Sequence, residues 1–376
     1  MAAMTQTSGP TAPTLSTRRL NRALLARQLL LDRVDMPLTD AVTHLAGLQA
    51  QAPRPPYHAL AARLRGFDPA ALSALLERRE VVRLVTLRST VHLHTPADAL
   101  TLRPFSTPAL ERELKIFRSR LEGVDLARLT ELTRELADPG PVSLRAVGEE
   151  LRREWPAHDP LALKVAARVL LPLVQVPPRG LWGRGGQVVL ATAGSWLGAE
   201  PVTDPDAEPL VLRYLAAFGP ASVRDMQTWC GVTRLRPHFE ALRPRLRMFR
   251  DERGTELFDL PDAPRPAADT PAPVRFLGEF DNLTLSHADR TRVVPDEFRR
   301  RGHRRDHAFG SFLVDGFVRG LWRVTEAKAD RAATMHLETF APLARGERAE
   351  VEAEAAGVLE MLAPGSSQEL RTAEAA

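Results

Sequence analysis

Two glutamines separated by one small apolar residue, Gln49 and Gln51, are the side chains with the clearest potential for chemistry. They lie in the segment HLAGLQAQAPRPPYH, residues 44–58, where a predicted helix meets a proline-rich turn. Residues two apart on a helix face different directions, but Pro53 disfavours a helical Ala52, so we expect the helix to end near Gln51 and both amides to converge on one cleft. Paired carboxamides both accept and donate hydrogen bonds, so they can hold a water molecule. The alternative from spacing alone is a pair of surface glutamines at a frayed helix end.

His92 and His94 form a second close pair. They lie two apart in a predicted strand and therefore share a face. Metal binding would require further ligands that the neighbouring sequence does not supply, so we interpret them as core or DNA-facing histidines and predict no metal site. The single cysteine, Cys230, excludes intrachain disulfides and cysteine-ligated metal clusters. The turn at Gly183–Gly186 lacks the lysine and hydroxyl residue of a phosphate-binding loop, and we predict no cofactor.

Composition predicts a soluble protein of several domains. The chain has 376 residues, too many for one ordinary domain, and its 44% hydrophobic and 26% charged residues are typical of globular proteins. Charged residues interrupt every apolar run, so no membrane span is expected. The N-terminal segment has neither the charged start nor the apolar centre of a secretion signal. We therefore predict a cytoplasmic, nucleoid-associated protein.

Arginine supplies nearly all the positive charge, although the formal net charge is only +4. The guanidinium fork suits phosphate oxygens and base edges, which favours a nucleic-acid partner, while the alternative is the coding bias of a GC-rich genome. One arginine cluster is the densest and could follow phosphates or enter a minor groove, or could be a solvated loop. It consists of Arg299, Arg300, Arg301, Arg304 and Arg305.

Helices followed by a β-hairpin are predicted three times along the chain. In the first unit we expect helices at Asp40–Gln49 and Asp68–Arg78 and two strands within Val81–His94. In the third, Ser222 is expected to cap a helix. This order is typical of winged helices, whose second helix can enter a major groove. The predicted divisions are a disordered leader (1–18), winged helices at 19–105, 106–200 and 201–262, a β-rich domain at 270–345, and a C-terminal helix with a disordered tail at 346–376.

The last third of the sequence is rich in predicted strands. A strand at Val274–Phe280 precedes several others, and Asp315-Gly316 supplies a tight hairpin turn. We expect a small barrel, an acidic helix at Glu347–Leu362 and a disordered tail after Pro364. The predicted fold class is therefore α+β, with three tandem winged-helix units followed by a small β-barrel and a C-terminal helix.

The segment HLAGLQAQAPRPPYHAL resembles the defining motif of a bacterial winged-helix family whose characterised members are AlkZ-type DNA glycosylases, including enzymes that unhook interstrand crosslinks. The resemblance continues through VVRLVTLRSTVHLHTPAD, FLGEFDNLTLSHADRTRVVP and LVDGFVRGLWRV, and so spans residues 19–345. The family's glutamine–apolar–glutamine signature is matched at Gln49, Ala50 and Gln51. A related branch has aspartate at the second polar position, so Gln51 places this chain nearer the crosslink-unhooking branch.

The resemblance implies a monofunctional glycosylase acting on N7-alkylated purines. Alkylation at N7 makes the base a good leaving group, so amides that orient a water and the cationic sugar would suffice without a strong base. The motif offers no lysine for a Schiff base with the sugar. The implied partner is double-stranded DNA carrying alkylated purines or crosslinks, bound by a monomer. Besides the arginine cluster, the DNA contacts that we predict are Arg54, His92, His94, Asn282 and Arg290.

Two alternatives remain open at this point. A transcriptional regulator would use the winged helices only to bind DNA, with sequence selectivity and indifference to lesions. A non-enzymatic scaffold would use them for protein contacts, and its weak DNA binding would respond little to salt.

Overall fold

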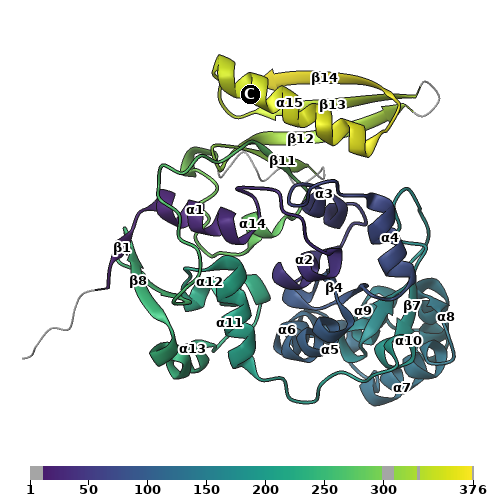
Figure 1. Ribbon diagram of the computed structural model, residues 1–376. Coiled ribbons are helices and arrows are strands. Elements are labelled where there is room, and N and C mark those ends of the chain that lie inside the picture. Colours follow the sequence, from purple (N-terminus) through teal and green to yellow (C-terminus); the bar gives the residue numbers. More distant parts are fainter. Residues whose placement is uncertain (1–11, 299–308, 328–330, 375–376) are drawn as a thin grey trace, which may run out of the picture.

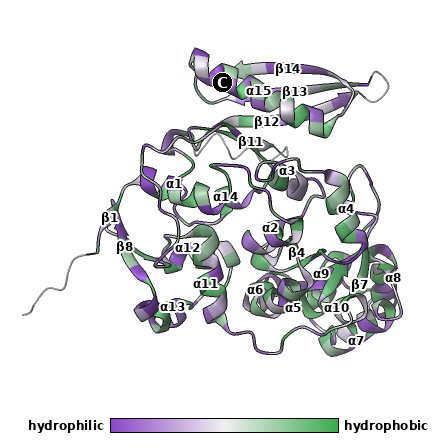
Figure 2. Cartoon of the chain, viewed as in Figure 1, coloured by the Kyte–Doolittle hydropathy of each residue, from purple (hydrophilic) through white to green (hydrophobic). Residues whose placement is uncertain are grey.

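A computed structural model describes residues 12–298, 309–327 and 331–374 and has a mixed α+β fold, as predicted (Figure 1). Within these residues no helix is both long and apolar enough to cross a membrane. Figure 2 shows hydrophobic residues concentrated where the helices of the first two predicted units pack around strands β4 and β7. The helices are α1 (Thr17–Arg27), α2 (Leu38–His44), α3 (Pro55–Ala61), α4 (Pro69–Glu77), α5 (Pro96–Phe105), α6 (Thr107–Ile116), α7 (Leu126–Ala137), α8 (Leu144–Glu154), α9 (Pro160–Leu170), α10 (Ala193–Leu197), α11 (Ala207–Phe218), α12 (Val223–Cys230), α13 (Arg236–Leu242), α14 (Asn282–Leu285) and α15 (Arg345–Leu362).

Local capping signals in the sequence were reliable guides to several helix starts. The Asp68 side chain accepts a hydrogen bond from the Ala70 N–H at the start of α4, whose first residue is a proline. Ser222 and Asp225 form a reciprocal capping box at the start of α12. Both helices begin where the sequence predicts.

The helix predicted over Asp40–Gln49 is wrong at its C-terminal end. Helix α2 stops at His44, and Ala46 and Gly47 then adopt positive φ angles of 55° and 89°. These two left-handed residues reverse the chain, which continues as the short strand β2. The reversal needs glycine at position 47, because a Cβ there would overlap the imidazole ring of His94.

A six-stranded antiparallel sheet joins the first two predicted units. Its order is β2-β4-β3-β6-β7-β5, and the β3–β6 pairing links the hairpin of the first unit to the strands of the second. The two units therefore share one sheet, whereas the sequence suggested a separate hairpin for each. The strands are β2 (Leu48–Gln49), β3 (Val82–Val85), β4 (Val91–His94), β5 (Val142–Ser143), β6 (Leu173–Gln175) and β7 (Val189–Thr192).

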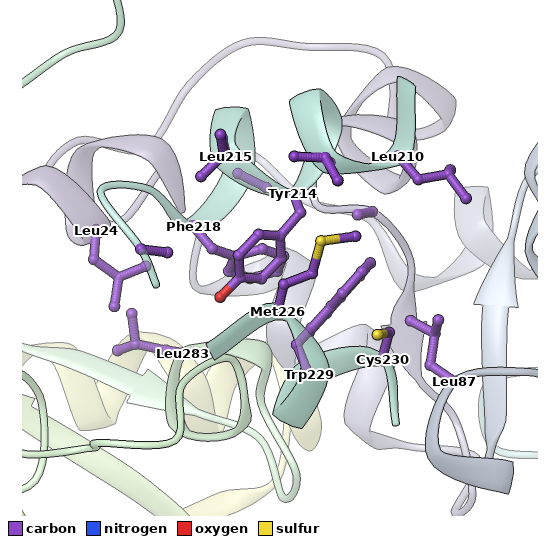
Figure 3. Close-up of a cluster of buried hydrophobic side chains, with 14 of the residues drawn as sticks. Leu24, Leu87, Leu210, Tyr214, Leu215, Phe218, Met226, Trp229, Cys230 and Leu283 are labelled. Carbon is purple, nitrogen blue, oxygen red and sulfur yellow. The ribbon is translucent and has the colours of Figure 1, made fainter. Parts of the chain in front are cut away.

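The third unit contains α11 to α13 and the hairpin of β8 (Arg247–Asp251) and β9 (Glu256–Asp259). Strand β1 (Thr14–Leu15) pairs in parallel with β8, so the predicted disordered leader is wrong for these two residues. Leu87 also packs in the aromatic core of the third unit (Figure 3). It comes from the short 3₁₀ helix η1 (Leu87–Ser89) of the first unit. This shared core fixes the third unit against the first.

The C-terminal domain is a five-stranded open sheet that lies over α1, α3 and α14 (Figure 1). The predicted small barrel is not confirmed, since β10 and β14 are the two edges of the sheet among the described residues. The predicted disordered tail is also wrong, because residues in it form β14, which pairs in parallel with β13. The strands are β10 (Arg275–Leu277), β11 (Gly310–Val314), β12 (Phe317–Ala327), β13 (Ala332–Thr339) and β14 (Ser367–Glu374).

Candidate active site

Gln49 and Gln51 lie on an extended segment beside β4, not at a helix end. The Ala50 N–H donates a 2.7 Å hydrogen bond to the Val91 carbonyl, which aligns the segment along that strand. Successive residues of an extended chain point to opposite faces. Leu48 and Ala50 are buried in the core, at 2% and 0% exposure, so the two glutamines share the opposite face. The predicted convergence of the amides therefore has a basis in strand geometry instead of a proline-terminated helix.

Both glutamine amides are held by their carbonyl oxygens. Arg88 Nη2 donates to Gln49 Oε1 at 2.7 Å, and the Val91 backbone N–H donates to Gln51 Oε1 at 3.0 Å. Gln49 is only 8% exposed, whereas Gln51 is exposed. A carbonyl oxygen has two lone pairs, so each amide keeps one acceptor position and its NH₂ donors for a bound molecule.

Arg88 connects Gln49 to the third unit. It lies in η1 with a φ of 53°, and its Nη1 donates to the carbonyl of Trp229 near the end of α12. Burial lowers the pKa of Arg88 to about 10, so the guanidinium stays charged at neutral pH. No local pattern marks Arg88 as a site residue, although it lies within the family-like segment VVRLVTLRSTVHLHTPAD.

His92 and His94 are buried, at 1% and 0% exposure, which favours the core interpretation over direct DNA contact. Their rings stack with centroids 5.7 Å apart, and Thr86 Oγ1 lies 3.0 Å from His94 Nε2. Burial lowers the pKa of His94 to about 4 and that of His92 well below its usual value. Both rings are therefore neutral at pH 7. Among the described residues, no group of three or more His, Cys, Asp or Glu side chains could hold a metal ion.

Asn282 is also buried, and it positions the glutamine segment instead of facing outward. Its Nδ2 donates to the Leu45 carbonyl at 3.0 Å and to the Gly47 carbonyl at 2.7 Å. The preceding Asp281 forms a fully buried ion pair with Arg63 at 2.7 Å. Helix α14 is thereby tied to the turn that leads into β2.

The residues that follow Gln51 in the sequence line a cavity of about 560 Å³. The proline turn, the glycine-rich turn and the C-terminal sheet meet there. Its walls include Trp182 and Trp322, and the ring of His58 lies 6.5 Å and 5.3 Å from theirs. Burial, followed by the charge of Arg54, lowers the pKa of His58 to about 4. No local pattern marks these aromatic residues as site candidates, although His58 and Trp322 lie in the family-like segments.

Charged groups also line this cavity. The Arg54 side chain is 54% exposed, and its Nη1 lies 3.1 Å from Glu326 Oε1. The Arg54 guanidinium lies 6.0 Å from the centroid of the Trp182 ring. Burial raises the pKa of the Glu279 carboxyl above its usual value. Of the predicted DNA contacts, Arg54 is therefore the one placed at an open surface beside Gln51.

Arg290 is not among the residues that line this cavity. Arg290 is half-buried, and the neighbouring Asp289 pairs with Arg253 at 2.8 Å, not with Arg290. The arginine cluster lies outside the described residues: Arg299, Arg300, Arg301, Arg304 and Arg305.

Comparison with known proteins gives a consistent assignment. The sequence profile named DNA glycosylase AlkZ-like matches residues 42–361. The chain belongs to this AlkZ-like family. An interstrand DNA cross-link repair glycosylase of Streptomyces sahachiroi is 25% identical over 342 residues, covering 80% of this chain and 86% of that protein. The solved DNA glycosylase AlkZ of the same organism has the same fold, with a TM-score of 0.78 and 22% identity over 96% of this chain and 100% of that one.

Membership in the AlkZ-like family confirms the resemblance drawn from the four sequence segments, and with it the prediction of a DNA glycosylase. The alternative of a non-catalytic regulator is not favoured. In the AlkZ-like fold of this chain, Gln49 ends the edge strand β2 and Gln51 lies two residues further on. Three separate elements hold this segment in place: η1, β4 and α14.

Proposed function

We propose that this AlkZ-like glycosylase hydrolyses the N-glycosidic bond of N7-alkylated purines in double-stranded DNA, with Gln49 and Gln51 at the reaction centre. The observation that carries the proposal is the pair of carboxamides two residues apart on an extended segment, each fixed through its carbonyl oxygen. An N7-alkylated base already carries a positive charge and leaves readily. The protein then needs to place a water and stabilise the cationic sugar, for which oriented dipoles suffice.

The two amides are suited to different parts of this task. Gln51 is exposed and can reach a nucleotide, while Gln49 is nearly buried beneath it and charge-assisted in its bond to Arg88. A water bridging the two would donate to the free lone pairs of the carbonyl oxygens and direct its own lone pair at the sugar carbon. Because no lysine lies in the motif, we propose a monofunctional enzyme that leaves an abasic site.

The positive charge directed at Gln49 comes from Arg88 and not from His92. His92 is the cross-strand partner of Gln49, and its neutral ring adds no positive charge beside the developing oxocarbenium ion. The charge of Arg88 is directed at the Gln49 oxygen and the Trp229 carbonyl.

Crosslinked DNA is the second proposed substrate. The relative from Streptomyces sahachiroi is named an interstrand DNA cross-link repair glycosylase. A crosslinked nucleotide cannot swing fully out of the duplex, and Gln51 is exposed just after an edge strand instead of lying at the bottom of an enclosed pocket. We propose that Arg54 and Arg290 contact the DNA backbone. We also propose that a monomer acts, in the cytoplasm at the nucleoid.

The test is a single-turnover assay on duplex DNA with one N7-methylguanine, and on a duplex with a nitrogen-mustard crosslink. Gln49→Ala and Gln51→Ala are each expected to lower the rate of abasic-site formation about 100-fold or more, the scale of losing an oriented transition-state contact. Fluorescence anisotropy should show DNA binding within about twofold of wild type.

Gln187→Ala provides the matched control, because Gln187 is exposed in a loop and does not line the cavity. It should leave the rate unchanged. Undiminished turnover in both glutamine variants would reject the catalytic assignment, and absence of base release by wild type from either duplex would reject the proposed substrates.

A further inference from the structure

Phe280 is an aromatic side chain in an unusual position. It is 43% exposed, and its backbone has a φ of 57°. A left-handed conformation is costly for a bulky residue and persists only where the surroundings impose it, which is most often at functional sites. Among the described residues it is the only aromatic in the set of exposed large hydrophobic side chains, which are Ile116, Leu126, Leu161, Val202 and Phe280.

The loop that carries Phe280 runs beside the glutamine segment. A Cβ at Gly278 would lie 3.0 Å from the Pro55 carbonyl, and two residues beyond Phe280 the Asn282 amide donates to the Gly47 carbonyl. The loop therefore passes residues 55 and 47 at its two ends. Phe280 lies between these two contacts along the chain.

The backbone after Phe280 is held firmly. Arg63 Nη2 and Nη1 donate to the two Asp281 carboxylate oxygens at 2.7 Å and 2.8 Å, and both side chains are fully buried. The Asp281 carboxylate also accepts from the Leu283 N–H at the start of α14. Phe280 is thus exposed on a loop that buried contacts fix to the segment containing Gln51.

We propose that Phe280 is a wedge that enters the base stack next to the damaged nucleotide. This inference rests on the proposed function. Apolar side chains inserted between base steps unstack them partly and kink the duplex. Partial unstacking would expose the sugar carbon to Gln51 without full extrusion of the nucleotide, which a crosslink forbids. Stacking of the ring on the neighbouring base replaces the lost base–base contact.

The experiment compares wild type, Phe280→Ala, Phe280→Trp and the control Leu161→Ala on a duplex with one N7-methylguanine. A second duplex carries a tetrahydrofuran abasic analogue beside the lesion, so that its stack is already open. Phe280→Ala is expected to lose about tenfold or more in kcat/KM on the intact duplex and to recover on the opened one. Phe280→Trp and Leu161→Ala should stay near wild type on both.

A 2-aminopurine placed next to the lesion reports unstacking on binding, independently of base release. Wild type and Phe280→Trp should raise its fluorescence, and Phe280→Ala should not. Equal activity of Phe280→Ala and wild type on the intact duplex, or equal loss on both duplexes, overturns the wedge. If wild type releases no base from either duplex, the proposed function fails, and the 2-aminopurine signal alone then decides whether Phe280 inserts.

Discussion

Two neighbouring segments of the site differ in almost every physical respect. The glutamine segment, residues 45–54, presents polar groups whose carbonyl oxygens are each bound by a donor. The phenylalanine loop, residues 278–282, presents an apolar ring in a left-handed backbone, exposed and unsupported by the core. The first is organised to hold small polar species in fixed positions. The second is organised to keep an apolar group in water until DNA arrives.

The same clamp holds both segments. Asn282 ties the phenylalanine loop to the glutamine segment through the Leu45 and Gly47 carbonyls, and Asp281 ties it to Arg63 at the end of α3. A site that uses both the Gln51 amide and the Phe280 ring requires a fixed distance between them, because small displacements of reacting groups reduce rates strongly. The comparison therefore predicts that damage to the clamp affects both functions together.

Breaking the clamp should have the largest effect. Asp281→Ala leaves the Arg63 guanidinium buried without its partner, so we expect the free energy of unfolding to fall by about 3–5 kcal/mol. Asp35→Ala is the matched control, since the Asp35–Arg65 pair is exposed at 74% and 61% and should contribute less than about 1 kcal/mol. Urea unfolding curves measure both. Similar losses in the free energy of unfolding of the two variants would show that the buried pair stabilises the fold no more than the exposed pair does.

Low pH should destabilise both segments, because each packs against a buried neutral histidine. His94 packs on Gly47 of the glutamine segment, and His58 packs on Gly278 of the phenylalanine loop. Burial lowers the pKa of each to about 4, so the unfolded chain takes up protons first as pH falls. Their contribution is complete above pH 6.5 and is lost between about pH 6.5 and 4.

At pH 5 this amounts to about 2 kcal/mol for each histidine. Urea unfolding at pH 7 and pH 5 measures this loss of the free energy of unfolding. In His94→Asn, the part of the loss that the two histidines cause should be about half as large. A wild-type protein equally stable at both pH values would show that these rings do not have to be protonated on unfolding.

The fold was predictable from sequence wherever local signals decided it. Asp68 and Ser222 cap their helices as expected, and Val81–His94 contains the two predicted strands. The pairing of β3 with β6 was not predictable, because it joins residues about 90 positions apart through contacts that no local pattern records. The same holds for β14, whose sequence lacks an apolar alternation and becomes a strand only beside β13.

The candidate site was predictable only in part. The glutamine pair is marked by its motif, but its strand geometry depends on the left-handed Ala46, a residue whose type gives no sign of positive φ. Arg88 and Glu279 reach the site through tertiary contacts between distant segments. The histidine pair lay where a strand was expected, but periodicity alone could not show that its face is covered.

The smallest expected effect concerns the left-handed backbone at Phe280. Phe280→Gly should raise the free energy of unfolding by about 1 kcal/mol relative to Phe280→Ala, because glycine adopts the left-handed backbone without the steric cost of a Cβ. Both variants lack the ring and should lose activity equally on an intact duplex. Thermal and urea unfolding compare the two proteins, and a glycine variant no more stable than the alanine variant would show that position 280 is unstrained. A stability gain together with lost activity would show that the strained backbone at position 280 is retained for the sake of the ring it carries.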